Sequence, residues 1–542
     1  MTEPLDTLWW RDGVIYQIYP RSFHDSDGDG LGDLPGVTTR LDYLADLGVA
    51  AIWLSPFYPT PDIDFGYDIS DHCDIDPRFG TMADFDELVK QAHARGLRIV
   101  LDLVLNHTSD QHPWFTESRS RLKNPKRDWY IWRDTSSGKV PGKGKPNNWT
   151  AMFGGSAWEL DPLTGQYYLH LFAKEQPDVN WRNPAVRKAQ LDVVRFWLRR
   201  GVDGFRLDVF NAYFKDEWLR DNPTRYPILH QLFSEHLYDI DQPEMIPLLN
   251  DLRTILDSYP GRYAVGETSF ATSEKAASYC GPDKLHAAFS LELTGLGGLG
   301  AGWGTGFITR KINQREEDFK AARVWPTTVL GNHDVPRPAS RYCRGENDSM
   351  AKIAMALLLT LRGTPFLYYG DEIGMRDLKL KRREIMDPAG KAFWPFYKGR
   401  DGCRSPMQWD STSQGGFTTA QPWLKVHPNY LQRNLEAQRQ DPQSLFNLTR
   451  TLIGLRKHTP ALTIGDFAFV PSAAKPVLAY TRSTLGQSVL VLLNFARRPV
   501  NTGEAAKDGL WKLLFSNQRT TLPLEMGKFE LIPYEVCLLL KE

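Results

Sequence analysis

The stretch that decides the fold is GVDGFRLDVF, residues 201–210. It has the pattern of a short buried strand that ends in a carboxylate, Asp208. Before it, residues 185–200 carry apolar side chains at helical spacing, and Gly201 is placed to end that helix. Buried charges are rare unless paired, so Arg206, two residues before Asp208, predicts an ion pair between the two. A purely structural pair in a barrel core remains an alternative at this point.

Further strand-like runs alternate with helical stretches on both sides of this segment. They are residues 14–19, 51–54, 97–104, 262–267, 287–290, 326–331 and 365–370. Eight strands separated by helices predict a (β/α)8 TIM barrel, an α/β fold.

Polar residues gather where these strands end. His107 follows the third strand, Glu267 ends the fifth, and His333 and Asp334 follow the seventh. The carboxyl ends of barrel strands converge on one mouth, which is where barrel active sites lie. Scattered structural charges would not follow that rule, so the pattern predicts an active site.

Two regions depart from the alternation of strands and helices. Residues 107–175 are rich in Trp, Lys, Pro, Asn and Gly, and they predict an inserted subdomain after the third strand. Residues 464–542 contain short β-rich runs, which predict a C-terminal antiparallel β-sandwich. The barrel is then expected to comprise residues 1–106 and 176–463.

Composition excludes several classes of protein. Lys and Arg together number 65, as do Asp and Glu, and this balance argues against nucleic acid or an anionic membrane as partner. The five cysteines are scattered and odd in number, which favours a reducing compartment over a disulfide framework or a zinc site. The sequence shows neither a signal-peptide pattern nor a long apolar run, so a cytoplasmic location is expected.

An acidic loop follows the first strand. Residues 25–33, DSDGDGLGD, alternate Asp with Gly, as loops do that gather hard oxygen ligands around Ca²⁺ or Mg²⁺. Carboxylates packed this closely repel one another without a cation, so a metal is expected. The alternative is a solvated acidic turn.

Three carboxylates at one mouth suggest glycoside hydrolysis. A retaining mechanism needs a nucleophilic carboxylate and an acid/base carboxyl about 5–5.5 Å apart. Arg206 would keep Asp208 ionised, and His107 and His333 would donate hydrogen bonds to sugar hydroxyls. These considerations do not say which carboxylate has which role.

Several motifs carry a family resemblance that covers most of the chain. DLVLNH (102–107), GFRLD (204–208), GE (266–267) and NHD (332–334) are similar, in order, to the four signature regions of the α-amylase family, glycoside hydrolase family 13. QPDVN (176–180), DFGYD (64–68) and GRDGCRSPMQW (399–409) resemble its oligo-1,6-glucosidase and α-glucosidase subfamily.

The resemblance implies a role for each matching residue. Asp208 matches the nucleophile, Glu267 the general acid/base, and Asp334 the third carboxylate, which clamps the sugar hydroxyls. The residues matching the rest of the glucose pocket are Asp64, Tyr67, His107, Phe153, Phe172, Arg206, His333 and Arg400. For the two phenylalanines, an ordinary core position is the alternative. The residues matching the structural metal loop are Asp25, Asp27, Asp29, the Leu31 backbone and Asp33.

The function implied is that of an exo-acting, retaining α-glucosidase without an organic cofactor. Its substrates would be short oligosaccharides such as maltose and isomaltose, with transglucosylation as a side activity, and it would be a monomer or homodimer. Val209 is the residue type that accompanies α-1,6 activity in this subfamily, whereas the segment 375–398 departs from the oligo-1,6-glucosidase pattern.

Three alternatives stay open beside the α-glucosidase interpretation. A trehalose synthase or a sucrose-acting enzyme of the same family is the first pair, although residues 335–338, VPRP, lack the arginine-rich loop of sucrose isomerases. A non-catalytic relative that partners amino-acid transporters is the third. Such relatives lose catalytic carboxylates and carry a membrane anchor.

Overall fold

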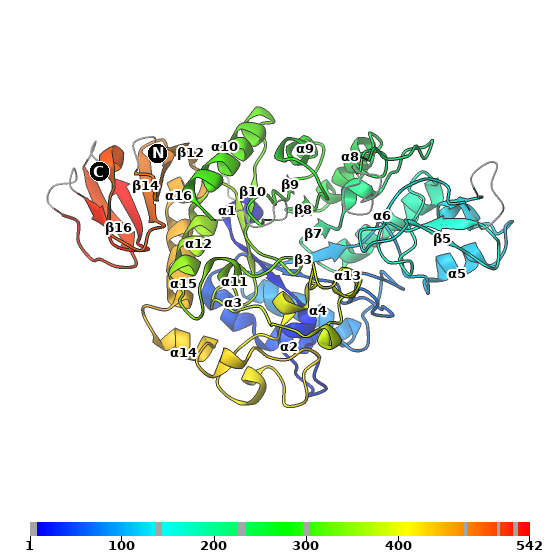
Figure 1. Ribbon diagram of the computed structural model, residues 1–542, viewed down its shortest axis with the longest axis horizontal. Helices are drawn as coiled ribbons and strands as arrows, with labels where there is room; N and C mark the ends of the chain where they lie inside the picture. Colours follow the sequence, from blue (N-terminus) through cyan, green and yellow to red (C-terminus); the bar gives the residue numbers. More distant parts are fainter. Residues whose placement is uncertain are drawn as a thin grey trace.

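A parallel eight-stranded sheet lies at the centre of the computed structural model (Figure 1), which describes residues 8–135, 144–224, 235–295, 303–470, 474–506, 510–523 and 529–542. Its strand order is β10-β11-β1-β2-β3-β7-β8-β9. The strands are β1 (Ile15–Ile18), β2 (Ala51–Leu54), β3 (Arg98–Leu103), β7 (Gly204–Leu207), β8 (Tyr263–Gly266), β9 (Ala287–Ala288), β10 (Thr327–Val329) and β11 (Thr364–Tyr368). All eight overlap the predicted strands, and the predicted barrel is confirmed.

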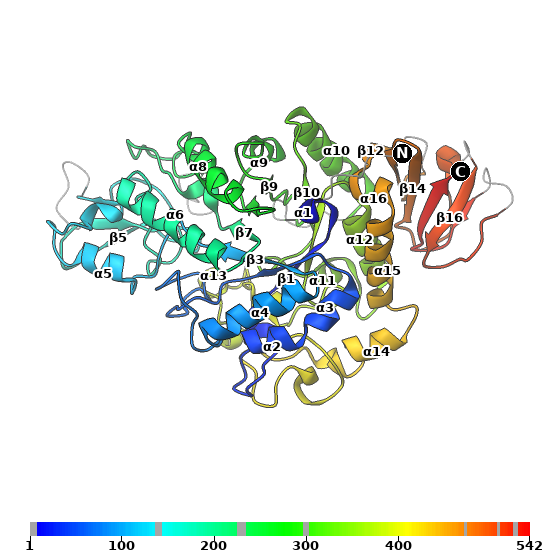
Figure 2. The same cartoon turned by 180° about the vertical axis from the view of Figure 1, so that it is seen from behind.

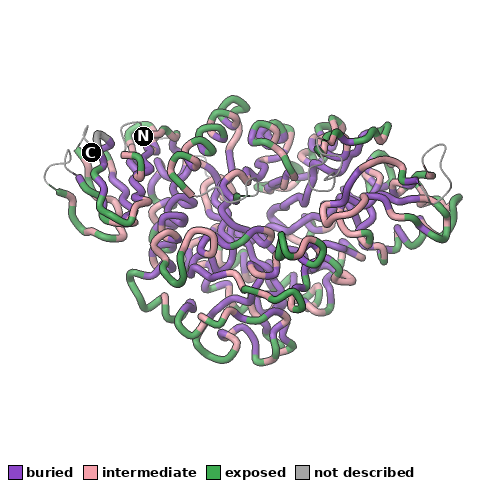
Figure 3. The backbone as a smooth tube through the Cα atoms, in the orientation of Figure 1, coloured by how far each residue is buried: buried purple, intermediate pink, exposed green. Residues whose placement is uncertain are grey.

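The sheet curls until its two end strands approach each other. The Thr327 hydroxyl on β10 donates to the Ala288 carbonyl on β9, 3.2 Å away, and accepts from the Ser290 N–H at 3.1 Å. This side chain joins the end strands and brings the sheet close to a full barrel. Figure 3 shows the strands as a buried centre with more exposed chain around it.

Helices surround the sheet (Figure 2). They are α1 (Trp9–Asp12), α2 (Leu34–Thr39), α3 (Leu41–Leu47), α4 (Met82–Ala94), α6 (Pro184–Arg199), α8 (Met245–Asp257), α9 (Ser273–Ser278), α10 (Thr305–Ala321), α11 (Pro338–Tyr342), α12 (Ser349–Thr360), α13 (Pro388–Ala392), α14 (Leu435–Gln440), α15 (Leu445–His458) and α16 (Pro460–Ile464). Within the described residues, no helix combines the length and apolarity needed to cross a membrane.

The sequence pattern was wrong about one helix. The sequence of residues 37–47 predicts a single helix, but α2 begins at Leu34 and Arg40 separates it from α3. The earlier start has a clear cause: Asp33 accepts a hydrogen bond from the Gly36 N–H as the N-cap residue, and Pro35 lies in the first turn.

The inserted subdomain and the C-terminal sheet lie at opposite ends of the molecule (Figures 1 and 2). The subdomain contains α5 (Pro113–Arg119) and an antiparallel sheet of β4 (Trp132–Arg133), β6 (Tyr167–Leu169) and β5 (Trp158–Leu160). Its strands all belong to the segment predicted as an insertion. The exact domain boundaries stay a prediction.

The C-terminal region consists of two antiparallel sheets. The larger has the order β12-β13-β14-β18-β16 and the smaller pairs β15 with β17. Val500, Phe529 and Leu531 pack against Leu490 and Leu492 in one apolar cluster, as a β-sandwich requires. The strands are β12 (Asp466–Phe469), β13 (Val477–Thr484), β14 (Gln487–Asn494), β15 (Val500–Asn501), β16 (Trp511–Ser516), β17 (Glu530–Leu531) and β18 (Val536–Lys541).

A buried arginine fastens this C-terminal sheet to the barrel. Arg482 on β13 donates to the Thr360 carbonyl at the end of α12 (2.7 Å) and to the Gly465 carbonyl (2.9 Å). Tyr480, also on β13, hydrogen-bonds the Thr360 hydroxyl. Burial lowers the pKa of Arg482 to about 9, because its contacts are carbonyls and not carboxylates.

A second buried charge lies between β1 and α3. Glu372 is fully buried, and its Oε1 accepts hydrogen bonds from Tyr16 (3.0 Å) and Tyr43 (2.6 Å). Burial raises the pKa of Glu372 to about 7, although both tyrosine hydrogen bonds lower it.

We expect this carboxyl to make folding stability pH-dependent. A carboxyl whose pKa is higher in the folded than in the unfolded protein contributes its full stabilisation below the unfolded-state pKa. That contribution is lost as the pH rises through the folded-state pKa. Between pH 5 and 8, Glu372→Gln should therefore gain up to about 3 kcal/mol of unfolding free energy relative to the unmodified protein. Urea denaturation across this pH range measures the gain, with exposed Glu317→Gln as control; parallel curves for all three proteins would contradict it.

Candidate active site

One guanidinium organises the carboxylates at the barrel mouth. Arg206 on β7 places Nη1 2.7 Å from Asp102 Oδ1 and 2.6 Å from Asp208 Oδ1, while Nη2 lies 2.5 Å from Glu267 Oε2. These side chains come from the carboxyl ends of the adjacent strands β3, β7 and β8. The predicted pair of Arg206 with Asp208 is therefore present, within a larger cluster.

Asp203, at the other end of β7, has a different environment. Its carboxylate pairs with Arg262 (2.9 Å) and Arg98 (3.1 Å), beside the starts of β8 and β3. His93 Nε2 lies 2.6 Å from it. One end of β7 therefore carries a structural ion cluster around Asp203, and the other end carries the cluster around Arg206 at the barrel mouth.

The carboxyls around Arg206 compete for one positive charge. Burial raises the pKa of Asp102 to about 6 and also raises the pKa values of Asp208 and Glu267, while Arg206 lowers all three. One cation cannot hold three buried carboxyls ionised, so the cluster retains a proton near neutral pH.

Asp334, on the other side of the mouth, has the opposite electrostatic environment. Burial would raise the pKa of Asp334, but the Arg400 and Arg404 guanidinium groups outweigh it and hold the pKa well below its ordinary value. Arg404 Nη2 lies 3.1 Å and Arg400 Nη1 3.3 Å from Asp334 Oδ1. Asp334 is therefore an anion at neutral pH.

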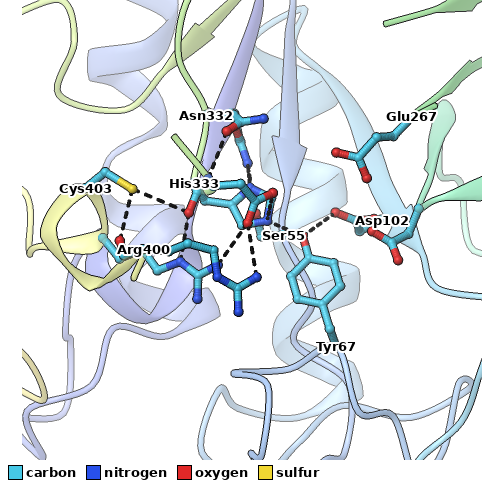
Figure 4. Close-up of polar contacts among 12 residues, drawn as sticks. Ser55, Tyr67, Asp102, Glu267, Asn332, His333, Arg400 and Cys403 are labelled. Atoms are coloured by element: carbon cyan, nitrogen blue, oxygen red, sulfur yellow. Dashed lines mark hydrogen bonds and ion pairs between the residues drawn. The ribbon is translucent and has the colours of Figure 1, made fainter. Parts of the chain in front are cut away.

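His333 and Tyr67 connect the two groups of carboxylates. Gln17 donates to His333 Nδ1 (2.8 Å), and His333 Nε2 lies 2.7 Å from the Tyr67 hydroxyl, which donates to Asp102 Oδ2 at 3.0 Å. These contacts assign a neutral imidazole that carries its proton on Nε2, and burial lowers the pKa of His333 accordingly. Figure 4 shows Tyr67 pointing between Asp102 and His333.

Arg400 joins three segments beside these carboxylates. Its Nη2 lies 2.7 Å from Asp64 Oδ1 and 2.6 Å from Asp387 Oδ1, in addition to the contact with Asp334. Asp387 also accepts from the Gly390 N–H as the N-cap of α13. Arg400 thus fastens the segment that carries α13 to the loop between β2 and α4.

The inserted subdomain supplies an aromatic wall. The Phe172 ring lies 5.1 Å from His107 and 5.7 Å from Phe153, and Arg400 Cζ lies 5.2 Å from the Phe153 ring centroid. Both phenylalanines are only partly buried. The structure therefore places both rings beside residues predicted for the glucose pocket. Phe172 also packs against the apolar core of the subdomain, so the role of the two phenylalanines as pocket walls stays a prediction.

A buried lysine holds His107 and the subdomain in place. Lys215 Nζ lies 2.6 Å from Asp178 Oδ2 and donates to Asn106 Oδ1 at 2.8 Å. Burial lowers the pKa of Lys215, and Asp178 counters that effect. Since Asn106 precedes His107, this ion pair fixes the loop that positions the histidine.

The acidic loop brings three of its predicted ligands together. Asp25, Asp27 and Asp29 each offer an oxygen within 4.8 Å of the others, a set of hard donors that fits Ca²⁺ or Mg²⁺. Asp33 is not in this group: its carboxylate accepts from the Ser26 N–H (2.9 Å) and caps α2. The roles of Asp33 and of the Leu31 backbone as ligands stay predictions.

Comparison with known proteins shows which family this chain belongs to. Residues 17–465 match the model of the α-amylase catalytic domain. The chain belongs to the α-amylase family. Such a match, together with the curated relatives below, makes it a glycoside hydrolase.

The relatives match over nearly the whole chain. A "Probable alpha-glucosidase" of Rhizobium meliloti is 44% identical over 92% of this chain and 91% of its own. An oligo-1,6-glucosidase of Parageobacillus thermoglucosidasius is 38% identical over 98% of each. Among solved structures, the alpha-glucosyl transfer enzyme XgtA is 40% identical, with a TM-score of 0.92 over 99% of this chain and 100% of that one.

The family motifs pointed to most of this pocket but missed some of its ionic partners. Arg404, four residues after Arg400 in the same motif, contacts both Asp334 and the His333 carbonyl. Asp387 lies in the segment that departs from the oligo-1,6-glucosidase pattern, so no motif marked it. Gln176, at the start of QPDVN, donates to Asp64 Oδ2 (3.2 Å), so Gln176 and Arg404 both lie within motifs although neither was predicted as a site residue.

Proposed function

We propose that this α-amylase family member is a retaining, exo-acting α-glucosidase that removes terminal glucose from short oligosaccharides. The observation that carries the proposal is the geometry at Arg206, where Asp208 and Glu267 hydrogen-bond the two terminal nitrogens of one guanidinium. That arrangement keeps the two carboxyls a few ångströms apart, as a retaining pair needs.

In the first step, Asp208 attacks the anomeric carbon and a covalent glucosyl-enzyme forms. Glu267 transfers its proton to the leaving oxygen as the glycosidic bond breaks. Water then gives a proton back to Glu267 and attacks the same carbon, which releases α-glucose and Asp208. An alcohol in place of water gives transglucosylation, which we propose as a side activity.

The retained proton of the cluster is assigned to Glu267. Burial and the nearby Asp334 anion raise the pKa of Glu267 against the effect of Arg206, and Asp334 stays ionised through Arg400 and Arg404. A fixed anion beside Glu267 therefore supports its role as the acid, and Arg206 supports an ionised Asp208 as nucleophile.

The ion pairs of Arg400 support exo-action. Arg400 joins Asp64, Asp334 and Asp387, so three segments meet at the end where the non-reducing glucose would lie. A pocket closed at this end accommodates a chain terminus and not the middle of a polymer. Maltose and isomaltose are the proposed substrates.

Sucrose isomerisation is the second candidate. Several structural neighbours are of the trehalulose synthase MutB, and one at 34% identity and a TM-score of 0.89 is a mutant in complex with the substrate sucrose. The hydrolase assignment is supported by the relatives with higher identity and by residues 335–338, which differ from the sucrose isomerase loop.

A side-by-side measurement of kcat/KM on isomaltose, maltose, sucrose and trehalose, with products separated by chromatography, tests the proposal. Release of α-glucose from maltose or isomaltose is expected. Preference for isomaltose would support Val209 as the linkage determinant, at a discrimination of roughly 1–3 kcal/mol. Conversion of sucrose into an isomer, or of maltose into trehalose, would overturn hydrolysis as the main reaction.

We also propose that Asp25, Asp27 and Asp29 bind Ca²⁺ or Mg²⁺ in a structural site. The three carboxylates repel one another, and the pKa of Asp27 is raised by burial and by its two neighbours. A chelator should lower Tm by roughly 2–4 °C, since a chain of this size loses about 1 °C per kcal/mol and a tightly bound ion contributes about 3–4 kcal/mol. Asp29→Asn should remove the difference, and a Tm indifferent to both chelator and added Ca²⁺ would contradict the site.

A further inference from the structure

The loop after the proposed nucleophile contains a strained residue. Val209 has φ 34° and ψ 41°, in the left-handed region that β-branched side chains rarely adopt. Its backbone N–H faces the Glu267 carboxylate and lowers the pKa of that group. The turn thus directs part of the nucleophile loop toward the acid/base residue, at a conformational cost that the surroundings must offset.

The contacts that hold this turn come from Asn211, two residues further on. Asn211 is completely buried. Its Nδ2 donates to the Ser269 carbonyl at 3.0 Å, and its Oδ1 accepts from the Ser269 N–H at 3.0 Å. The amide thereby pairs with both backbone groups of one residue, as a neighbouring strand would, in the loop that begins at Glu267.

A second set of contacts, made with Asp241, fixes Asn211. The Asp241 N–H donates to the Asn211 carbonyl (2.7 Å), and Asn211 Nδ2 also lies 3.2 Å from Asp241 Oδ1. Tyr279 donates to the same Asp241 oxygen at 2.7 Å, and its ring packs edge-on against Phe210 at 4.9 Å. The amide has little freedom to turn, because its hydrogen-bonding atoms are all engaged.

We propose that Asn211 is a positioning residue that sets the placement of Glu267 relative to Asp208. The last backbone hydrogen bond between β7 and β8 runs from the Glu267 N–H to the Leu207 carbonyl (2.9 Å), so no further strand pairing fixes the residues that follow. Beyond it the chains diverge into loops, and the Asn211 amide joins those loops directly. The inference rests on the proposed function, since it concerns how the acid/base carboxyl is held for proton transfer.

The consequence is selective for steps that need the proton of Glu267. In Asn211→Ala the Glu267 loop loses two hydrogen bonds and Val209 can relax, so the acid moves relative to the leaving oxygen. Misplacement by about 1 Å can cost roughly 100-fold in rate. A substrate such as 2,4-dinitrophenyl α-glucoside has a leaving group that departs without protonation, so it should be affected much less.

The experiment compares kcat/KM for maltose and for 2,4-dinitrophenyl α-glucoside in the unmodified enzyme and in Asn211→Ala. We expect about a 100-fold loss on maltose and less than about a 10-fold loss on the aryl glucoside. The basic limb of the pH profile on maltose should also move. A maltose-to-aryl ratio within about twofold of the unmodified enzyme would overturn the proposal.

Two further variants keep the result interpretable. Asn434→Ala removes a comparable buried amide at the N-cap of α14, which donates to the Tyr430 carbonyl and accepts from the Ala437 N–H. This variant should lower Tm without changing the substrate ratio. Asn211→Asp preserves shape but loses the donor to Ser269, and it should change the ratio in the same direction if Asn211→Ala does not fold. Failure of the unmodified enzyme to release α-glucose from either substrate would instead reject the proposed function.

Discussion

Replacing Asp208 with Asn should abolish turnover, with a loss in kcat of at least about 10⁴-fold on every α-glucoside, because the amide cannot form the glucosyl-enzyme. The fold should persist, since the amide oxygen can still accept from Arg206, 2.6 Å away in the unmodified protein. Initial rates on maltose and far-UV circular dichroism of the same preparation measure the two outcomes.

The matched control lies on the same strand. Asp203→Asn makes the same chemical change at the opposite end of β7, where the partners are Arg98 and Arg262. It should lower stability and leave kcat near that of the unmodified enzyme. With α-glucosyl fluoride and azide, Asp208→Asn should form β-glucosyl azide by direct displacement, and near-normal hydrolysis by this variant would reject the mechanism.

Replacing Glu267 with Ala should separate the two chemical steps. On maltose we expect kcat/KM to fall about 10³- to 10⁴-fold, because the leaving oxygen departs unprotonated. On 2,4-dinitrophenyl α-glucoside the first step needs no acid, so kcat/KM should change by less than about 10-fold while kcat falls through slow hydrolysis of the glucosyl-enzyme.

Azide distinguishes this variant from the nucleophile variant. Azide needs no general base, so it should restore kcat of Glu267→Ala on the aryl glucoside and give α-glucosyl azide, with the opposite configuration to the product from Asp208→Asn. The basic limb of the pH profile should also disappear, because it reports ionisation of Glu267. Equal losses on maltose and on the aryl glucoside would assign the acid/base role to another group.

The sequence predicted where these carboxylates lie because its main signals are local. A strand that ends in a carboxylate marks a position on the barrel mouth. Asp208 and Glu267 directly follow β7 and β8, and Asp334 lies in the loop that follows β10. Since the barrel brings these ends together, the location of each residue could be inferred before any contact was known.

The contacts that were missed join residues that no single motif contains. Arg400 pairs with Asp64 across 336 positions, and with Asp387 in a segment without a recognisable motif. Asp33 shows a different difficulty, since one carboxylate can serve as a metal ligand or as a helix cap and its sequence position fits both. Side-chain geometry, and not residue type, separates such cases.

The way β13 is fastened to the barrel limits how freely the C-terminal sheet can be exchanged between relatives. Arg482 and Tyr480 both hydrogen-bond Thr360, and the buried Arg482 guanidinium contacts backbone carbonyls in place of a carboxylate. A chimera that grafts a foreign sheet lacking this pair would leave the end of α12 with unsatisfied polar groups. Recombination points for hybrid enzymes should therefore fall before α12 or after the whole sheet, so that helix and strand are inherited together.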